Sequence, residues 1–233
     1  MSEANEHVKS EGIETTTEKT TEDREIVEVY LDDLEALLKD IDELENDEDI
    51  TTKIDRVLTS ERVIYLQGII DKESISSVVA MIHYYNLEDD KNDISPEDRK
   101  NIKIYISSEG GEIIWCKKLL AAIENSKCKI ETISEGGQIA SAGFIIFLAG
   151  DIRKLSRHSE PLYHNLSAGF EGTYSEMKTQ MAYYDKTQRE MDEYIISRTS
   201  IPMKRLKKYR ERNLDWHMTF EECKKYKVFD IEI

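Results

Sequence analysis

Segments typical of β-strands alternate with segments typical of helices between residues 62 and 149, and this alternation limits the fold more than any other feature. Strand-like runs lie at 62–68 (RVIYLQG), 102–107 (IKIYIS) and 129–133 (KIETI). Between them, apolar residues recur at spacings of three and four, as in helices with one buried face. Strands that alternate with helices predict an α/β fold with mainly parallel pairing.

The second half of the chain continues with helices and short strands. Residues 139–149 are apolar nearly all round, which predicts a helix buried on every side. The strand-like pieces IRKLS and PLYHN follow at 152–156 and 161–165, and a long helical pattern then covers 174–198. No internal repeat is visible, so the sequence indicates one main domain, which we expect over residues 51–233.

Acidic side chains are concentrated at the amino-terminal end. Residues 1–50 hold 19 of the 48 acidic side chains and four of the 32 basic ones, in a chain of net charge −16. Residues 1–24 have almost nothing to bury, so we expect a disordered acidic arm. Residues 25–50 predict a short, acidic amphipathic helix, which either packs on its own domain or a neighbouring subunit or docks a separate partner. Its apolar stripe is Leu31, Leu34, Leu38 and Ile41.

Charge and composition exclude several classes of protein. An acidic arm repels nucleic acid and anionic lipid, so we expect no binding to either. The three cysteines (Cys116, Cys128 and Cys223) are too few and too scattered for a disulfide framework, and no Cys/His spacing suggests a metal site. Reduced thiols of this kind indicate a cytoplasmic protein. The amino terminus lacks the apolar region of a signal peptide, and the longest apolar run, FIIFLA, is too short to span a bilayer.

A pair of glycines follows the second strand-like run, in SSEGGE at 107–112. Glycine permits positive φ and lets a ligand approach the backbone closely. The first N–H groups of the helix that follows have no internal partner and carry partial positive charge. Such a turn can hold an anion, including one that forms only in a transition state. An ordinary turn is the alternative interpretation.

A single serine, Ser141, stands among small residues in GGQIASAG at 136–143. Small neighbours would let another chain approach the hydroxyl. The segment matches neither GxGxxG nor GxxxxGK[ST], and it is half of a GxSxG elbow because Ile139 stands where the first glycine should be. A serine used as a small packing residue is the alternative interpretation.

A nucleophilic serine needs a general base, and His164 is the best candidate among the five histidines. It sits in the apolar, strand-like PLYHN, 23 residues after Ser141. The other four lie in the acidic arm, on a helix face, in a charged turn and next to a tryptophan. A histidine on a strand next to a buried helix is well placed to take the proton of the serine. A histidine that only packs in the core is the alternative interpretation.

Five segments in this order resemble the Clp peptidase family, the serine-protease subunits of ATP-dependent Clp proteases. They are YISSEGG, GGQIASAG, PLYHN with the glycine-containing loop after it, the long helical pattern, and LDWHMTFEECKKYKVFD. The corresponding family motifs read Y-I-N-S-P-G-G, G-x-A-A-S-M-G, M-I-H-Q-P and D-x-F-[ML]-[ST]-A-x-E-A-x-x-Y-G-L-[IV]-D. The resemblance covers roughly residues 62–233.

The resemblance implies a serine endopeptidase. It makes Ser141 the nucleophile, His164 the base and Asp215 the acid that orients the histidine. It also implies that the backbone N–H groups of Gly111 and Ala142 form the oxyanion hole.

The resemblance further implies the fold and the partners. The fold would be a spiral of β-β-α units, which Clp peptidases share with crotonases. Homo-oligomeric rings would enclose the sites in a chamber, with the helix at 174–198 interlocking two rings. A separate AAA+ unfoldase ATPase would supply polypeptide substrates, and no metal or organic cofactor is implied.

The chain departs from the family pattern at several positions. Glu109 puts a charge where the family has a proline beside the Gly-Gly turn. The other replacements are Ile139 for an alanine, Ala142 for a methionine, Asn165-Leu166 for Gln-Pro, and Lys227 for a glycine.

Three alternatives remain beside the ATPase-linked peptidase. The first is a stand-alone Clp-like processing peptidase, such as one that matures a viral capsid. The second is a catalytically silent ring subunit, which retention of all three triad positions argues against. The third is an acyl-CoA enzyme of the crotonase fold, which uses a backbone oxyanion hole but does not need Ser141, His164 and Asp215 together.

Overall fold

The predicted alternation of strands and helices is present in the computed structural model, which describes residues 49–233. In chain order the elements are α2 (Ile50–Ser60), β1 (Val63–Ile70), α3 (Lys72–Lys91), β2 (Ile102–Gly111), α4 (Ile113–Glu124), β3 (Ile130–Ser134), β4 (Gly137–Ala140), α5 (Ala142–Ala149), β5 (Ile152–Leu155), β6 (Ser159–Tyr163), α6 (Tyr174–Arg198), α7 (Met203–Glu211), β7 (Trp216–His217), α8 (Phe220–Lys225) and β8 (Ile231–Glu232). The arm predicted over 1–24 lies outside the described residues, as does the helix predicted over 25–50 apart from its last two positions.

Strand β2 is the centre of the sheet because it pairs with three other strands. It runs parallel to β1 from Lys103 opposite Val63 to Gly111 opposite Ile70, with one shift in register between Gln67 and Ile69. Its amino half also pairs with β3, and Ser108 near its carboxyl end pairs with β4. β2 therefore belongs to two layers of strands that diverge along its length.

The chain moves from one layer to the other between β3 and β4, which are two residues apart. β5 then pairs with β3 in the first layer, and β6 pairs with β4 in the second. Two β-β-α units result, β3–β4–α5 and β5–β6–α6. The strand order is β7-β6-β4-β2-β3-β5-β8, with β1 on β2, and all pairs in the described residues are parallel except β6 with β7.

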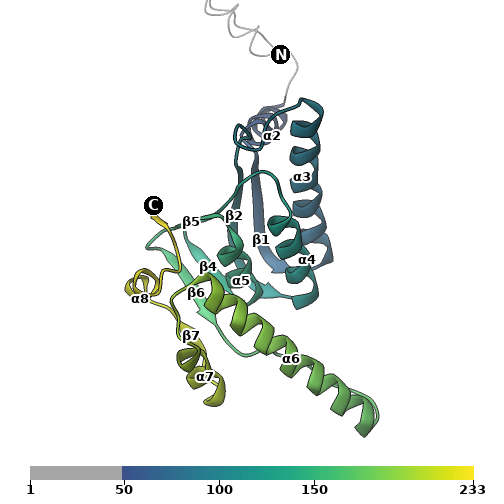
Figure 1. Cartoon of the computed structure of the whole chain (residues 1–233), viewed down its shortest axis with the longest axis vertical. Coiled ribbons are helices and arrows are strands. Elements are labelled where there is room, and N and C mark those ends of the chain that lie inside the picture. Colours follow the sequence, from purple (N-terminus) through teal and green to yellow (C-terminus); the bar gives the residue numbers. More distant parts are fainter. Residues whose placement is uncertain (1–48) are drawn as a thin grey trace, which may run out of the picture. The chain divides into compact units, whose positions relative to one another are not determined.

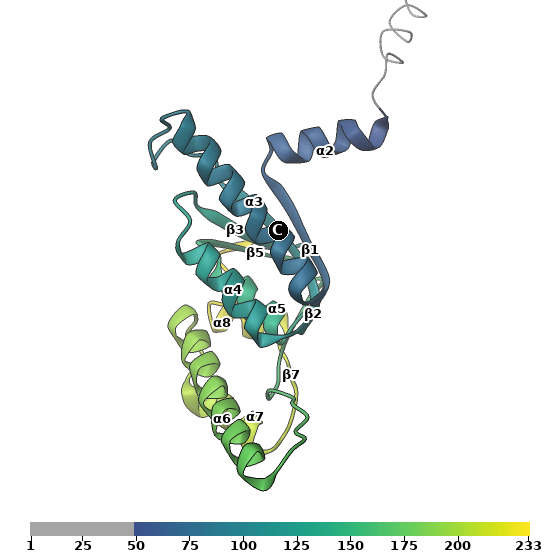
Figure 2. The same ribbon diagram turned by 90° about the vertical axis from the view of Figure 1, so that its right-hand side faces the viewer.

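Helices cover the strands and close the core. α3 packs on β1 and on α4, and α4 packs in turn on α5 (Figures 1 and 2). Every residue of α5 is buried, as the sequence predicts. All five residues of β3 are buried as well, as expected of a parallel strand covered on both faces.

The sequence predictions are confirmed for most elements and wrong at several boundaries. The strands predicted over 62–68 and 102–107 continue to Ile70 and Gly111, so the Gly-Gly pair expected in a turn belongs to β2, and helix α2 was not predicted. The α/β class, the mainly parallel pairing and the helix over 174–198 are confirmed. The helix predicted over 139–149 begins only at Ala142, because Ile139 and Ala140 belong to β4. Ile139 is fully buried in this strand, and its hydrophobicity alone does not distinguish a strand from a helix.

The two halves of helix α6 lie in different environments. A capping box between Thr173 and Glu176 fixes its first turn. The amino-terminal half extends away from the strands, whereas Met191 and Ile195 in the other half pack into the core (Figure 1). At its last turn, Arg198 donates hydrogen bonds to the carbonyl groups at the end of α5, including Leu148 O at 2.8 Å. Arg198 thereby satisfies carbonyl groups that α5 itself leaves unpaired.

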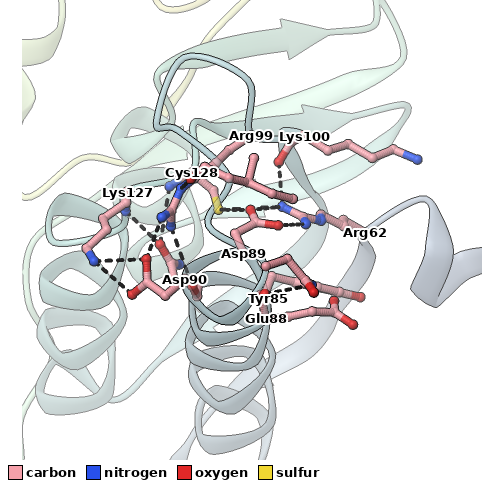
Figure 3. A network of polar contacts seen from close by, with 12 residues as sticks. Arg62, Tyr85, Glu88, Asp89, Asp90, Arg99, Lys100, Lys127 and Cys128 are labelled. Atoms are coloured by element: carbon pink, nitrogen blue, oxygen red, sulfur yellow. Dashed lines mark hydrogen bonds and ion pairs between the residues drawn. The ribbon is translucent and has the colours of Figure 1, made fainter.

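A buried ion pair lies at the amino-terminal end of β1 (Figure 3). Arg62, which precedes β1, binds Asp89 of α3 through both carboxylate oxygens and donates to the carbonyl of Lys100 at 2.9 Å. The thiol of Cys128 lies 3.4 Å from the same carboxylate, and Asp89 is 1% exposed. Hydrogen bonds from Arg62 hold the pKa of Asp89 below its ordinary value, although burial alone would raise that pKa.

Across residues 49–233, no helix combines the length and the apolar character that crossing a membrane requires.

We predict that Asp89→Ala lowers the free energy of unfolding by about 3–5 kcal/mol at pH 7, because Arg62 is left buried without its partner. The folded-state pKa of Asp89 is depressed, so its stabilisation is present above the unfolded-state pKa of about 3.9 and is lost as the pH falls through the folded value. The difference in the free energy of unfolding between wild type and variant should therefore become smaller at acidic pH. Chemical denaturation at several pH values measures this. Glu232→Gln, which breaks the exposed Arg157–Glu232 pair, is the control and should have a much smaller effect. Equal effects of the two variants would contradict the prediction.

Candidate active site

The implied nucleophile, base and oxyanion residue come together because three parallel strands end at one edge. Gly111 is the last residue of β2, Ser141 follows β4 and His164 follows β6. β2 pairs with β4, and β4 pairs with β6, so these strand ends are neighbours. The sequence predicts His164 inside a strand over 161–165, but β6 ends at Tyr163, so His164 lies one residue beyond the strand. Ligands of parallel sheets generally bind outside the carboxyl ends of the strands.

The backbone of Ser141 is held in an uncommon conformation. Its φ of 55° and ψ of −122° are rare for a residue with a side chain and carry strain. The Ser141 N–H donates to the carbonyl of Leu162 in β6 at 3.0 Å. Ser141 is also the N-cap of α5, yet its hydroxyl makes no capping hydrogen bond. A serine at an N-cap usually binds the first turn of its own helix, so this hydroxyl is free for another use.

The Gly-Gly segment of β2 passes too close to its neighbours for any side chain. A Cβ at Gly110 would lie 2.6 Å from Ser141 Cβ, and one at Gly111 would lie 2.2 Å from Ile70 O. Both glycines have positive φ, 100° and 151° respectively. Gly110 therefore lets the end of β2 lie directly against the serine, and Gly111 lets it lie directly against β1.

The segment is shaped by Ser108, a residue whose role the sequence analysis missed. Ser108 is 2% exposed, and its hydroxyl donates to the carbonyl of Gly68, where a bulge in β1 occurs. The same hydroxyl accepts a hydrogen bond from the N–H of Gly110 at 3.0 Å. A serine two residues before a glycine is the signal for this turn, because a serine hydroxyl readily bonds its own backbone two residues on.

The two implied oxyanion donors, Gly111 and Ala142, line the same cavity as the serine. Ala142 is the first residue of α5, so its N–H has no carbonyl within the helix to bond, and it carries the positive end of the helix dipole. Ala142 and Gly111 both line a cavity together with Ser141 and His164. Donors placed in this way can stabilise negative charge that develops on a carbonyl oxygen near the serine.

Two hollows meet at Ser141. One is an open groove of about 520 Å³ that Ser141, His164 and Gly111 share with two acidic residues, Glu109 and Glu112. The other is a narrower, mostly apolar cavity behind the serine. Its further lining residues include Ile113, Phe144, Ile145, Met191 and Ile195.

Asp215 stands at the edge of this arrangement. It is exposed and lies just before β7, whose pairs with β6 are Leu162 with His217 and Tyr163 with Trp216. One further step of this antiparallel register sets Asp215 opposite His164. Within residues 49–233 no hydrogen bond joins His164 to Asp215 or to the hydroxyl of Ser141. In enzymes without substrate, catalytic hydrogen bonds are often long and tighten only when substrate binds.

The cysteines do not compete with Ser141 as nucleophiles. All three are buried and free. Burial raises the pKa of Cys116 and of Cys223 to about 12. Burial and the neighbouring Asp89 also raise the pKa of Cys128. Because the thiolate is the reactive form, these thiols are inert at neutral pH.

Comparison with known proteins identifies one family. A family model described as Clp protease matches residues 45–231. The chain is 30% identical over 178 residues to ATP-dependent Clp protease proteolytic subunit 2 of Corynebacterium glutamicum, which covers 76% of this chain and 83% of that protein. It is 27% identical over 176 residues to the ATP-dependent Clp protease proteolytic subunit of Pleurastrum terricola, covering 75% and 84%. The spiral of β-β-α units expected from the resemblance is confirmed.

We predict that Gly110→Ala lowers the reactivity of Ser141 by about 10²-fold or more, because the added methyl group displaces the serine from its place beside Gly111. Intact-mass measurement of labelling by a fluorophosphonate, a reagent for activated serines, gives the rate. Gly169→Ala is the matched control, since a Cβ there has no atom within 4 Å. A folded Gly110→Ala protein that reacts at the wild-type rate would contradict the prediction.

Proposed function

Since the chain belongs to the Clp protease family, we propose that it is a serine endopeptidase whose triad is Ser141, His164 and Asp215. The observation that carries the proposal is the uncapped, strained Ser141 at the start of α5, in the same groove as His164 and Gly111. A nucleophilic serine needs a hydroxyl that is not engaged in capping its own helix or in packing the core.

In the proposed mechanism, Ser141 Oγ attacks the carbonyl carbon of the peptide bond while His164 accepts the hydroxyl proton. The negative charge on the carbonyl oxygen is met by the N–H groups of Gly111 and Ala142. His164 then gives its proton to the leaving amine, which departs and leaves an acyl group on Ser141. Water, deprotonated by His164, then attacks the acyl carbon. The bond to Ser141 Oγ breaks, and His164 returns the proton to that oxygen. Asp215 stabilises the histidine cation in both halves of the reaction.

The groove suits an extended peptide. Beside the serine, its lining residues include Ile69 of β1, Leu166 and Tyr183. A peptide bound here as an additional strand would use backbone hydrogen bonds, which need no particular sequence. Glu109 and Glu112 give the groove negative charge, so an acidic substrate side chain at that point would meet like charge.

We further propose that the chain assembles into rings and receives unfolded substrates from an ATPase. The relatives are named as proteolytic subunits of ATP-dependent proteases. The outer half of α6 exposes Tyr174, Met181 and Tyr183, with exposed fractions of 78%, 56% and 50%. Large apolar side chains gathered on one helix support a contact with another copy of the chain.

Labelling with a fluorophosphonate tests the triad. We expect one adduct per wild-type chain, none on Ser141→Ala, and labelling slowed by about 10²-fold or more in His164→Ala and Asp215→Asn. Ser175→Ala, on the exposed outer part of α6, is the control and should label as wild type does. Native mass read from the same samples reports the assembly state. An assembled ring without an adduct would reject the peptidase and favour the silent subunit.

Substrate tests separate the remaining alternatives. An ATP-linked peptidase should cleave short peptides alone and degrade a folded protein only when an AAA+ ATPase and ATP are added. Cleavage of one specific protein without an ATPase would instead favour the stand-alone processing enzyme. Acyl-CoA turnover that survives Ser141→Ala would favour the crotonase-type enzyme.

A further inference from the structure

A buried carboxylate lies beneath the segment that carries His164. Asp192 of α6 is 0% exposed. Its Oδ1 accepts hydrogen bonds from Tyr163 Oη at 2.8 Å and from Gln188 Nε2 at 2.9 Å, and its Oδ2 binds Arg210 Nη1 at 2.6 Å. A carboxylate is costly to bury unless such partners surround it, so these four side chains hold one mutual arrangement.

Two of these contacts fix residues that lie before and after His164 in the sequence. Tyr163 immediately precedes the histidine, and its hydroxyl is fixed by Asp192. On the other side, Leu166 N–H donates to Gln188 Oε1 at 2.8 Å, while the amide nitrogen of the same Gln188 donates to Asp192. Both flanks of His164, which itself lies beyond the end of β6, are therefore tied to one carboxylate.

The third contact extends to the segment before Asp215. Arg210 lies in α7, five residues before Asp215, and its guanidinium binds Asp192. The carbonyl of Arg210 also accepts a hydrogen bond from Asn165 Nδ2 at 3.2 Å, and Asn165 follows His164. The segment before Asp215 and the segment around His164 are thus both held by the carboxylate of Asp192.

We propose that Asp192 is a positioning residue, which sets the distance between the His164 imidazole and its partners through Tyr163, Gln188 and Arg210. This inference rests on the proposed function. It goes beyond it because Asp192 does not line the groove or the apolar cavity and is not one of the residues that the family motifs imply. A displacement of about 1 Å at a catalytic group can cost about 10²-fold in rate.

The test compares Asp192→Asn with Asp89→Asn in the full chain. Asp89 is a matched control because it is equally buried and also binds an arginine, in the network of Figure 3. That network adjoins the amino end of β1, about 23 Å along the strand from the carboxyl end where the site lies. The measurements are the thermal midpoint, the native mass, the fluorophosphonate labelling rate, and kcat and KM for a fluorogenic peptide.

We expect both variants to lower the thermal midpoint, but only Asp192→Asn to lower the labelling rate and kcat, by about 10- to 100-fold, with KM within about twofold of wild type. A role in stability alone would not produce this split. Asp192→Asn labelling at the wild-type rate in the same assembly state would overturn the proposal. If the wild type itself were not labelled, the proposed function would fail first, and the two failures are thus distinguishable.

Three further variants test the proposal if Asp192→Asn does not fold. Gln188→Ala removes the link between Leu166 and Asp192 and should reproduce the loss of kcat. Arg210→Lys keeps the cation beside Asp192 and should retain more kcat than Arg210→Met. Wild-type kcat in both Gln188→Ala and Arg210→Met would overturn the proposal.

Discussion

The branching of β2 is the constraint on which the rest of the structure depends. Because its amino half pairs with β3 while Ser108 pairs with β4, the chain must cross between two layers within two residues. The crossing places the end of β4 beside the end of β2, and Ser141 follows at once. Helix α5 then has to begin in the core, since the two layers surround it. The close approach of glycine backbone to serine is thus a consequence of how the strands branch.

Other elements of the structure hold both ends of α5, the helix that follows Ser141. The strained backbone of Ser141, of a kind that typically costs about 1–3 kcal/mol, persists because β6 fixes its N–H and because α5 is buried throughout. At the other end of α5, Arg198 binds the last carbonyl groups. α6 therefore supports the site in two ways, through Arg198 at the far end of the helix that follows Ser141 and through Asp192, which binds Tyr163 next to His164. The strain at Ser141 is therefore maintained by packing and hydrogen bonds that are distributed over several elements.

Local patterns in the sequence predicted the elements well, and contacts between distant residues account for what they missed. The helix over 174–198 was predictable because its capping residues and its apolar spacing are local. The start of α5 was not, because β4 is defined by partners in β2 and β6 and not by its own residues. Ser141, His164 and Gly111 were found from motifs, and the structure brings them to one groove. The contacts of Asp192 could not be predicted from local patterns, since Tyr163 is 29 positions away in the sequence and Arg210 is 18 positions away.

The order of the residues along the chain has a consequence for synthesis. Gly111, Ser141 and His164 are made in that order, and Asp215 is made only after α6 and α7, 51 residues beyond His164. β7, which brings Asp215 towards β6, pairs with a strand that has by then long been complete. A chain that is still growing can therefore form most of the two layers while it lacks the acid of the proposed triad. If chains fold as they emerge, the proposed triad is therefore completed only after most of the two layers has formed.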